Sequence, residues 1–278
     1  MSSVVSSQNG YVEVDGGNLF YEVAGDGHPL VLIHADVADS RMWDEQFAAF
    51  ARHYRVIRFD KRGFGKTTSQ NGAYSFRQDI VTLLHHLGGS RTAILGLSNG
   101  GALALDFTLE HPELVDALIV VAGGVSGLQE SPVPPTPAEI ELFSQYEAAE
   151  QRKDYDTLTE LGVRAFGDGP GQPEGRAETS VRERMRDMIA NNYRLHSAEL
   201  VEPRRLEPPA IGRLGEIHVP TLVIVGDLDE TVTIAMMNMV AEGVVGARKV
   251  VFPGTAHMVN MEQPERFNAT VMRFLEPV

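Results

Sequence analysis

The chain has 278 residues, 43% of them hydrophobic and 22% charged, which suits a globular protein with one large domain, or a core domain carrying an insertion. Its net charge of −14 would repel a phosphate backbone and no basic run is present, so nucleic-acid binding is not expected. The absence of cysteine excludes disulfides, thiolate metal sites and a cysteine nucleophile, and it is compatible with a reducing compartment.

Neither a signal peptide nor a membrane span is expected. Residues 1–10 are polar and rich in serine, without the basic and apolar regions of a secretory signal. No apolar run approaches the roughly 20 residues that cross a bilayer. The sequence therefore predicts a cytoplasmic protein with no membrane partner.

The first predicted elements form a hairpin. Residues 11–14 and 19–23 flank Asp15-Gly16-Gly17-Asn18, which is a hairpin turn signal. We expect this hairpin to form an antiparallel edge of the sheet.

The core of the chain alternates strands and helices. Amphipathic stretches near 41–52, 76–87 and 100–110 predict helices. Strands covered on both faces lose the apolar–polar alternation, so unbroken apolar runs favour a parallel sheet under helices. This order indicates an α/β protein with a doubly wound, mostly parallel sheet. The runs lie at residues 30–33, 56–59, 93–95, 118–121 and 222–225.

The alternation breaks after Gly123. Residues 131–137 contain four prolines, which remove backbone donors and prevent a regular element. Residues 138–200 read as charged helices interrupted by a loop at 167–171, before a second proline group at 203–209. We therefore expect a helical lid over residues 125–212, inserted into a core domain of residues 11–124 and 213–278.

Apolar side chains in the predicted lid follow helical spacing. Most should form the interior of the lid, and one or two could line an apolar acyl pocket. The single tryptophan, Trp43, is expected to pack in the core rather than to contact substrate. The lid side chains are Phe143, Tyr146, Phe166, Met185, Met188 and Tyr193.

The segment Gly96-Leu97-Ser98-Asn99-Gly100 has the Gly-x-Ser-x-Gly pattern of a nucleophile elbow. Such a turn lifts a serine hydroxyl above the sheet, and small residues two positions before and after it relieve the clash between strand and helix. The pattern alone is weak evidence, but here it follows a predicted strand and opens a predicted helix, as an elbow requires. Ser98 is the predicted nucleophile.

A base and an acid follow in the order expected for such a serine. His257 lies in a glycine-containing loop after an apolar strand, late in the chain. Residues 222–225 lead into Gly226-Asp227-Leu228-Asp229, where an acid just beyond the strand end can turn toward that histidine. Asp229 is the predicted acid, and Asp227 is the alternative. The order Ser98, Asp229, His257 is that of α/β hydrolases.

These motifs together resemble the α/β-hydrolase superfamily over residues 11–278, especially its small esterases and lactonases, including the 3-oxoadipate enol-lactonase group. The resemblance implies a structural role for Asp60, Arg62 and Gly63 and is weak over the lid. Its motifs are the elbow around Ser98, Asp60-x-Arg62-Gly63-x-Gly65, Gly226-x-x-Asp229 and Gly254-x-x-His257.

The predicted oxyanion hole departs from the family pattern of His-Gly followed by another residue. Here the segment is His34-Ala35-Asp36, so the donors would be the backbone N–H groups of Asp36 and Asn99. A carboxylate pointing inward from Asp36 would repel the developing charge. Pointing outward, or protonated, it could bind substrate. It could equally turn to solvent or cap a neighbouring turn.

The predicted reaction is acyl transfer from a small-molecule ester or lactone to water, through an acyl-enzyme on Ser98. No metal or organic cofactor is expected, because neither ligand spacing nor a phosphate-binding loop appears in the sequence. A carbon–carbon hydrolase or a cofactor-free lyase on the same triad is an alternative, and so is a ligand-binding receptor or scaffold with little turnover. The sequence leaves the substrate and the oligomeric state open.

Overall fold

The computed structural model describes residues 6–70, 72–89, 91–131, 133–196 and 203–276. Its strands form one sheet in the order β1-β2-β4-β3-β6-β7-β8-β9, with β5 paired to β2. From β4 through β9 along this order the neighbours are parallel, whereas β2 is antiparallel to both β1 and β4. The strands are β1 (Ser7–Val14), β2 (Gly17–Ala24), β3 (Pro29–Ile33), β4 (Arg55–Phe59), β5 (Thr68–Ser69), β6 (Thr92–Leu97), β7 (Val115–Val121), β8 (Thr221–Gly226) and β9 (Arg248–Phe252).

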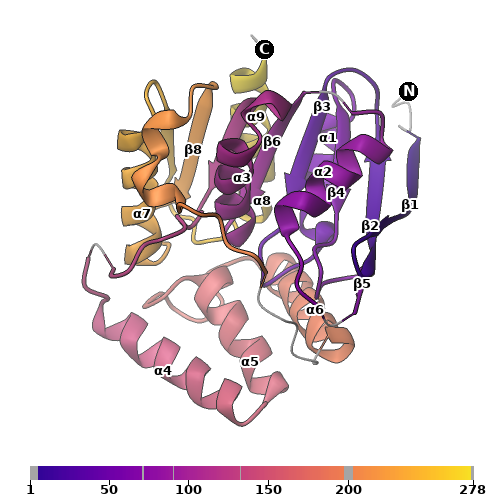
Figure 1. Cartoon of the computed structure of the whole chain (residues 1–278). Coiled ribbons are helices and arrows are strands. Elements are labelled where there is room, and N and C mark those ends of the chain that lie inside the picture. Colours follow the sequence, from indigo (N-terminus) through magenta and orange to yellow (C-terminus); the bar gives the residue numbers. More distant parts are fainter. Residues whose placement is uncertain (1–5, 71, 90, 132, 197–202, 277–278) are drawn as a thin grey trace.

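Helices cover both faces of this sheet (Figure 1). None of the described helices is both long enough and apolar enough to cross a membrane. The helices are α1 (Asp44–Phe50), α2 (Phe76–His86), α3 (Asn99–Glu110), α4 (Pro137–Gln151), α5 (Tyr155–Gly162), α6 (Thr179–His196), α7 (Thr231–Gly243), α8 (Val259–Glu262) and α9 (Pro264–Leu275). Shorter 3₁₀ turns include η1 (Ser40–Trp43), which leads into α1.

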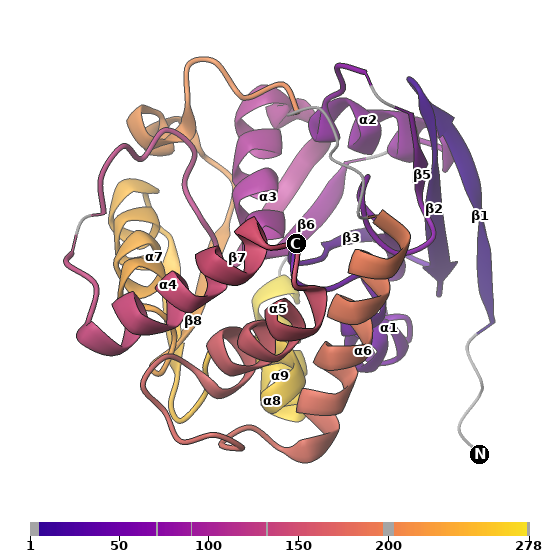
Figure 2. The same ribbon diagram turned by 90° about the horizontal axis from the view of Figure 1, so that it is seen from below.

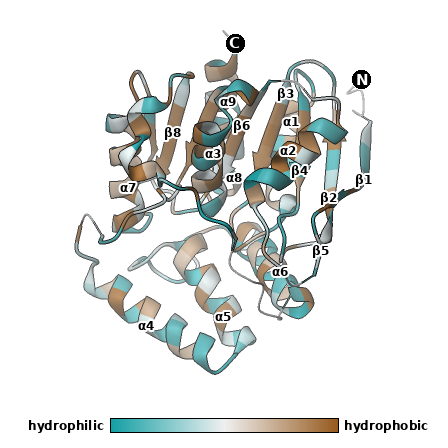
Figure 3. Cartoon of the chain, in the orientation of Figure 1, coloured by the Kyte–Doolittle hydropathy of each residue, from teal (hydrophilic) through white to brown (hydrophobic). Residues whose placement is uncertain are grey.

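The unbroken apolar runs are explained by burial on both faces. Successive side chains of a strand point to opposite faces. In β3, Leu30 and Leu32 join the apolar cluster that includes α1 and α9, whereas Val31 and Ile33 join the cluster that includes α2, α3 and α7. All four side chains have no exposed surface. The predicted doubly wound, mostly parallel sheet is confirmed, and its strands are the apolar centre of the molecule (Figure 3).

The predicted N-terminal hairpin is also confirmed as the antiparallel edge of the sheet. Strands β1 and β2 pair from Ser7 opposite Ala24 to Val14 opposite Gly17. The connecting turn is therefore shorter than the predicted turn signal and contains only Asp15 and Gly16. Gly16 has φ +72°, a conformation that glycine adopts without a side-chain clash.

Helices α4, α5 and α6 lie apart from the helices that flank the sheet, below it in Figure 1 and across its end in Figure 2. We call residues 137–196 the α4–α6 segment. The predicted loop at 167–171 begins later than expected, because α5 continues into a π-helix, Val163–Asp168. The π-helix ends where Gly169 takes φ +93°. Residues 197–202, the end of the predicted helical region, lie outside the described residues.

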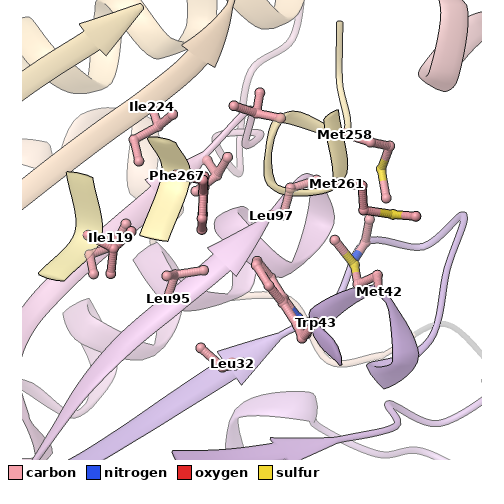
Figure 4. Packing of buried hydrophobic residues seen from close by; sticks show 14 of the residues in the cluster. Leu32, Met42, Trp43, Leu95, Leu97, Ile119, Ile224, Met258, Met261 and Phe267 are labelled. Atoms are coloured by element: carbon pink, nitrogen blue, oxygen red, sulfur yellow. The ribbon is translucent and has the colours of Figure 1, made fainter. Parts of the chain in front are cut away.

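Trp43 lies in the core, as the sequence predicts. Its side chain is fully buried and its ring centroid lies 6.2 Å from that of Phe267 in α9. Both belong to one apolar cluster with Leu95 and Leu97 of β6 (Figure 4). This packing joins η1 and α9 to the strand that ends at Ser98.

Replacing Phe267 with alanine should therefore lower the free energy of unfolding by about 3–5 kcal/mol, because a fully buried ring is removed from a close-packed site. Denaturant titration of both proteins measures the difference. Val245→Ala is the control, because Val245 is 80% exposed and should change stability by no more than about 0.5 kcal/mol. A loss below about 1 kcal/mol for Phe267→Ala would contradict the packing described.

Candidate active site

Ser98 occupies a sharp turn between β6 and α3. Its φ of 60° and ψ of −128° are strained for a residue with a side chain. Its N–H donates to the carbonyl of Val121 in the neighbouring strand at 2.9 Å, which holds the turn against the sheet. This is the geometry that the Gly-x-Ser-x-Gly pattern predicts, with the serine between the end of a strand and the first turn of a helix.

The two glycines of the pattern are required by close backbone contacts. A Cβ at Gly96 would lie 2.0 Å from the carbonyl oxygen of Gly100, and one at Gly100 would lie 2.4 Å from the carbonyl oxygen of Ile33. Both distances are far shorter than van der Waals contact. Glycine at these positions therefore allows α3 to begin directly against the ends of β3 and β6.

His257 and Asp229 form a buried pair. Asp229 follows β8 and His257 follows β9, and these strands are neighbours in the sheet. Nδ1 of His257 lies 3.0 Å from each carboxylate oxygen of Asp229. The alternative acid, Asp227, is exposed and accepts a hydrogen bond from the N–H of Gly254 at 2.7 Å. The structure therefore places Asp229, and not Asp227, against the histidine.

Asp229 also changes the pKa of the His257 imidazole. Burial by itself lowers the pKa of His257, but the charge of Asp229 and its hydrogen bond more than compensate, so the pKa lies above its ordinary value of 6.5. Nδ1 is therefore the protonated nitrogen of the neutral ring, and Nε2 is the basic one. Among the described residues, the buried Nε2 has no hydrogen-bond partner.

The structure does not join Ser98 to His257 directly. Within the described part of the chain, no hydrogen bond involves Ser98 Oγ. Both residues nevertheless follow the carboxyl ends of parallel strands, and such ends meet at one edge of a sheet. In free enzymes a catalytic hydrogen bond is often long and tightens only with substrate bound.

The two predicted oxyanion residues meet through their side chains. Nδ2 of Asn99 donates to Oδ2 of Asp36 at 2.6 Å, and the Lys61 ammonium forms an ion pair with Oδ1 of Asp36. Burial opposes ionisation of this carboxyl, but Lys61 and Asn99 together lower the pKa of Asp36 below its ordinary value. Its side chain is 44% exposed, yet it is an ion-paired carboxylate and not a protonated or purely solvated one.

His34 holds the loop that carries Asp36. The ring is fully buried, and burial together with the Lys61 charge lowers its pKa to about 3, so it is neutral. Nε2 accepts a hydrogen bond from the N–H of Lys61 at 2.9 Å, and Nδ1 donates to the carbonyl of Ala35 at 2.7 Å. Asp36 N–H, in contrast, donates to no described backbone or side-chain group, and Asn99 N–H is the first of α3 and has no intrahelical acceptor.

The Asp60 motif has the structural role that the resemblance implies. The carboxylate of Asp60 accepts hydrogen bonds from the N–H groups of Ser40 at 2.9 Å and Lys66 at 2.8 Å. Arg62 forms a buried bidentate ion pair with Asp79, at 2.7 Å for both bonds. These contacts fix the loop that follows β4.

The α4–α6 segment supplies one side chain directly to the histidine. The ring centroid of Phe166 lies 5.2 Å from that of His257 and 6.4 Å from that of Phe143. Other predicted lid side chains are interior: Met185 and Met188 are fully buried, and the Tyr146 and Tyr193 hydroxyls are 3.0 Å apart. Phe166 is thus an apolar residue of the predicted lid that reaches the candidate site.

A second contact between this segment and the histidine loop was not predicted. Arg176 donates to the carbonyl of Gly254 at 2.8 Å and forms an ion pair with Glu262 at 2.7 Å. Glu262 in turn accepts a hydrogen bond from the N–H of Ala256 at 2.8 Å, next to His257. Both charged side chains are mostly buried. No sequence motif marks this pair, because it joins segments about 80 residues apart only after folding.

Glu230 is another titratable group beside the pair that the sequence did not single out. Burial, followed by repulsion from Asp229 and Glu139, raises its pKa to about 7, although the nearby His257 opposes this shift. Glu139 at the start of α4 reaches the same place and accepts a hydrogen bond from the N–H of Thr231 at 2.6 Å. The surroundings of His257 therefore contain, besides Asp229, an acid that titrates near neutrality, Glu230.

A cavity of about 730 Å³ adjoins Asp36 and Asn99. Neither Ser98 nor His257 lines the cavity, which lies along α3 beside Asn99. Its walls come from α2, α3, the segment after β7 and residues 203–209, and much of the surface is apolar. The apolar wall residues include Phe76, Leu103, Val125, Leu128, Leu206 and Met236.

Within the described ranges, no group of three or more histidine, aspartate or glutamate side chains is arranged to hold a metal ion.

Comparison with known proteins agrees with this architecture. The alpha/beta hydrolase fold family matches residues 28–264. A 2-hydroxy-6-oxo-6-phenylhexa-2,4-dienoate hydrolase of Comamonas testosteroni is 29% identical over 274 residues, covering 92% of this chain and 91% of that protein.

Among solved structures, a thermophilic esterase from Thermogutta terrifontis is 26% identical with a TM-score of 0.76, over 97% of this chain and 98% of that one. An enol-lactonase from Burkholderia xenovorans LB400 shares the fold. It is 24% identical with a TM-score of 0.73, over 96% of this chain and 99% of that one. The protein belongs to the α/β-hydrolase fold family, and it is a hydrolase of this superfamily.

The role of Asp229 can be tested on the pKa of His257, measured by NMR titration of the ring protons. The wild-type pKa should lie above 6.5, and in Asp229→Asn it should fall below 6.5, because burial then acts without the carboxylate. Asp227→Asn is the matched control and should leave the pKa unchanged, since Asp227 bonds to Gly254 instead.

The same shift has a consequence for stability. Because the folded-state pKa exceeds the ordinary one, the pair stabilises the folded protein below pH 6.5, and this contribution is lost as the pH rises through the folded-state value. A wild-type pKa below 6.5 would contradict the assignment of Asp229.

Proposed function

We propose that this protein hydrolyses a carboxylic ester or lactone of a small molecule through an acyl-enzyme on Ser98. One observation carries the proposal: the strained Ser98 turn lies at the same sheet edge as the buried His257–Asp229 pair. A hydroxyl on an elbow, a base with a free Nε2 and an ionised acid on Nδ1 are the groups that acyl transfer by serine requires.

In the proposed first half-reaction, Nε2 of His257 takes the proton of Ser98 as Oγ bonds to the substrate carbonyl carbon. The carbonyl oxygen becomes an oxyanion, held by the N–H groups of Asp36 and Asn99. When this intermediate collapses, the carbon–oxygen bond to the alcohol breaks, and the alcohol leaves with the proton from His257. Asp229 stays ionised and stabilises the imidazolium.

In the second half-reaction, His257 takes a proton from water as the water oxygen attacks the acyl carbon. The acid leaves, and Ser98 recovers its proton from His257. His257 must be neutral at the start of each half-reaction, because only the neutral imidazole can accept a proton. Because Asp229 raises the pKa of His257, activity is expected to decline as the pH falls through that raised value.

We further propose that residues 125–212 form a lid and that the cavity beside Asn99 holds one apolar part of the substrate. Phe166 against His257 and the Arg176–Glu262 ion pair support this role, because both join the α4–α6 segment to the histidine loop. The cavity, of about 730 Å³, has the size of a pocket for a drug-sized molecule.

Cleavage of a carbon–carbon bond next to a ketone is the second candidate. It is favoured by the similarity to the dienoate hydrolase of Comamonas testosteroni, because the compound in that name carries a ketone and no ester. The same serine, histidine and oxyanion donors would serve, with a carbanion in place of an alkoxide as the leaving group.

The test is hydrolysis of a chain-length series of p-nitrophenyl esters and of several lactones by wild type and Ser98→Ala. The variant should lose at least about 10³-fold in kcat/KM, because the nucleophile is removed, and a fluorophosphonate probe should label the wild type at Ser98 only. The preferred acyl length would report the size of the pocket.

Ser180→Ala, an exposed serine at the start of α6, is the control and should retain wild-type activity. Ester hydrolysis that survives in Ser98→Ala would refute the proposed nucleophile. Labelling of Ser98 without turnover of any ester or lactone would favour carbon–carbon cleavage, whereas neither labelling nor turnover would favour a binding protein that has kept the fold.

A further inference from the structure

Lys61 carries a buried positive charge at the candidate oxyanion hole. It follows β4 by two residues, its side chain is 2% exposed, and its ammonium forms an ion pair with Asp36. The ammonium also lies 5.1 Å from the ring centroid of Phe64 and 5.8 Å from that of Phe76. A lysine is rarely buried this deeply unless a partner offsets the loss of hydration, and here the partner is Asp36.

Lys61 holds the loop after β3 at two points. Its backbone N–H donates to Nε2 of His34 at 2.9 Å, and its ammonium binds Oδ1 of Asp36. The other carboxylate oxygen of Asp36 accepts the side-chain N–H of Asn99 at 2.6 Å. One carboxylate therefore connects the loop after β4 to the first residue of α3.

The backbones at both ends of this connection are already close together. A Cβ at Gly100 would meet the carbonyl oxygens of Ile33 and His34 at 2.4 and 2.6 Å, so the start of α3 lies directly against the end of β3. The peptides before Asp36 and Asn99 supply the two proposed oxyanion donors. Small rotations of either peptide would redirect its N–H, and the Asp36 side chain resists such rotations.

The Lys61 ammonium also offsets the negative charge that Asp36 brings to the candidate oxyanion hole. A lone carboxylate at Asp36 would disfavour a second negative charge on a nearby carbonyl oxygen. The buried ammonium compensates that charge at short range, and a partly buried pair is screened less by salt than a fully exposed one.

We propose that Lys61, Asp36 and the Asn99 amide form a charge-compensated clamp that positions the two oxyanion donors, with Lys61 as a positioning residue. The inference rests on the proposed acyl-transfer function. The clamp acts through the backbone N–H groups, so it affects the chemical step more than substrate binding.

The experiment is a double-mutant cycle of Lys61→Met and Asp36→Asn, with kcat and KM measured on the best p-nitrophenyl ester. Lys61→Met should lower kcat by about 10², which is the scale of losing one oxyanion donor, and should change KM by less than about threefold. Asp36→Asn should lower kcat by about tenfold. The kcat of the double variant should lie within about threefold of the kcat of Asp36→Asn, because no uncompensated carboxylate remains.

Two further variants separate the clamp from general structural effects. Lys66→Met removes an exposed lysine from the same loop and should leave kcat unchanged. Asn99→Ala keeps the backbone donor but removes the exposed amide; it should fold as the wild type does and lower kcat by about tenfold. Thermal melting of each variant establishes that it is folded, and if Lys61→Met does not fold, Asn99→Ala still tests the clamp.

The outcomes distinguish the clamp from the function on which it rests. If the wild type hydrolyses esters and labels at Ser98 while folded Lys61→Met or Asn99→Ala retains wild-type kcat, the clamp is refuted and the proposed function stands. Losses that simply multiply in the double variant would also refute charge compensation. If the wild type neither labels nor turns over any ester or lactone, both proposals are overturned.

Discussion

The close approach of α3 to the ends of β3 and β6 is the constraint on which the candidate site depends. At Gly96 and Gly100 the backbones are so near that a single added carbon would overlap a carbonyl oxygen. The chain between these glycines must turn sharply, and Ser98 takes the strained conformation that results. The same approach places the first N–H of α3 beside the loop of Asp36. The proposed nucleophile and the proposed oxyanion donors therefore have one structural cause.

Three pairs of an acidic and a basic side chain, each at least partly buried, occur at the candidate site. Asp229 faces His257, Lys61 faces Asp36, and Arg176 faces Glu262. A buried ion pair is weak evidence for stability, because desolvation offsets much of the attraction, but loss of one partner leaves an uncompensated charge. Such pairs therefore fix positions more than they stabilise the fold. Each of the three joins segments from different parts of the chain at the carboxyl edge of the sheet.

In the proposed function, membership of the family and choice of substrate depend on different parts of the molecule. This chain shares its fold with an esterase that is 26% identical and is similar over most of its length to a dienoate hydrolase that is 29% identical. The cavity walls include residues 203–209 and the segment after β7, and Phe166 reaches His257 from the π-helix that extends α5. Variation in these segments can change the bound molecule without disturbing the elbow, which is why membership of the family does not name the substrate.

The features that depend on local pattern could be predicted from the sequence. Unbroken apolar runs predicted the parallel strands, the turn signal Asp15-Gly16-Gly17-Asn18 predicted the edge hairpin, and Gly-x-Ser-x-Gly predicted the turn at Ser98. Each of these follows from side-chain period or backbone sterics within a few residues. The sequence could only rank Asp229 above Asp227 as the acid, since both carboxylates follow the same strand. That assignment and the partners of Asp36 became visible only in the folded protein, because Lys61 and Asn99 lie 25 and 63 residues from Asp36 in the chain. Contacts between distant segments have no period or spacing in the sequence, so folding alone brings such charges together.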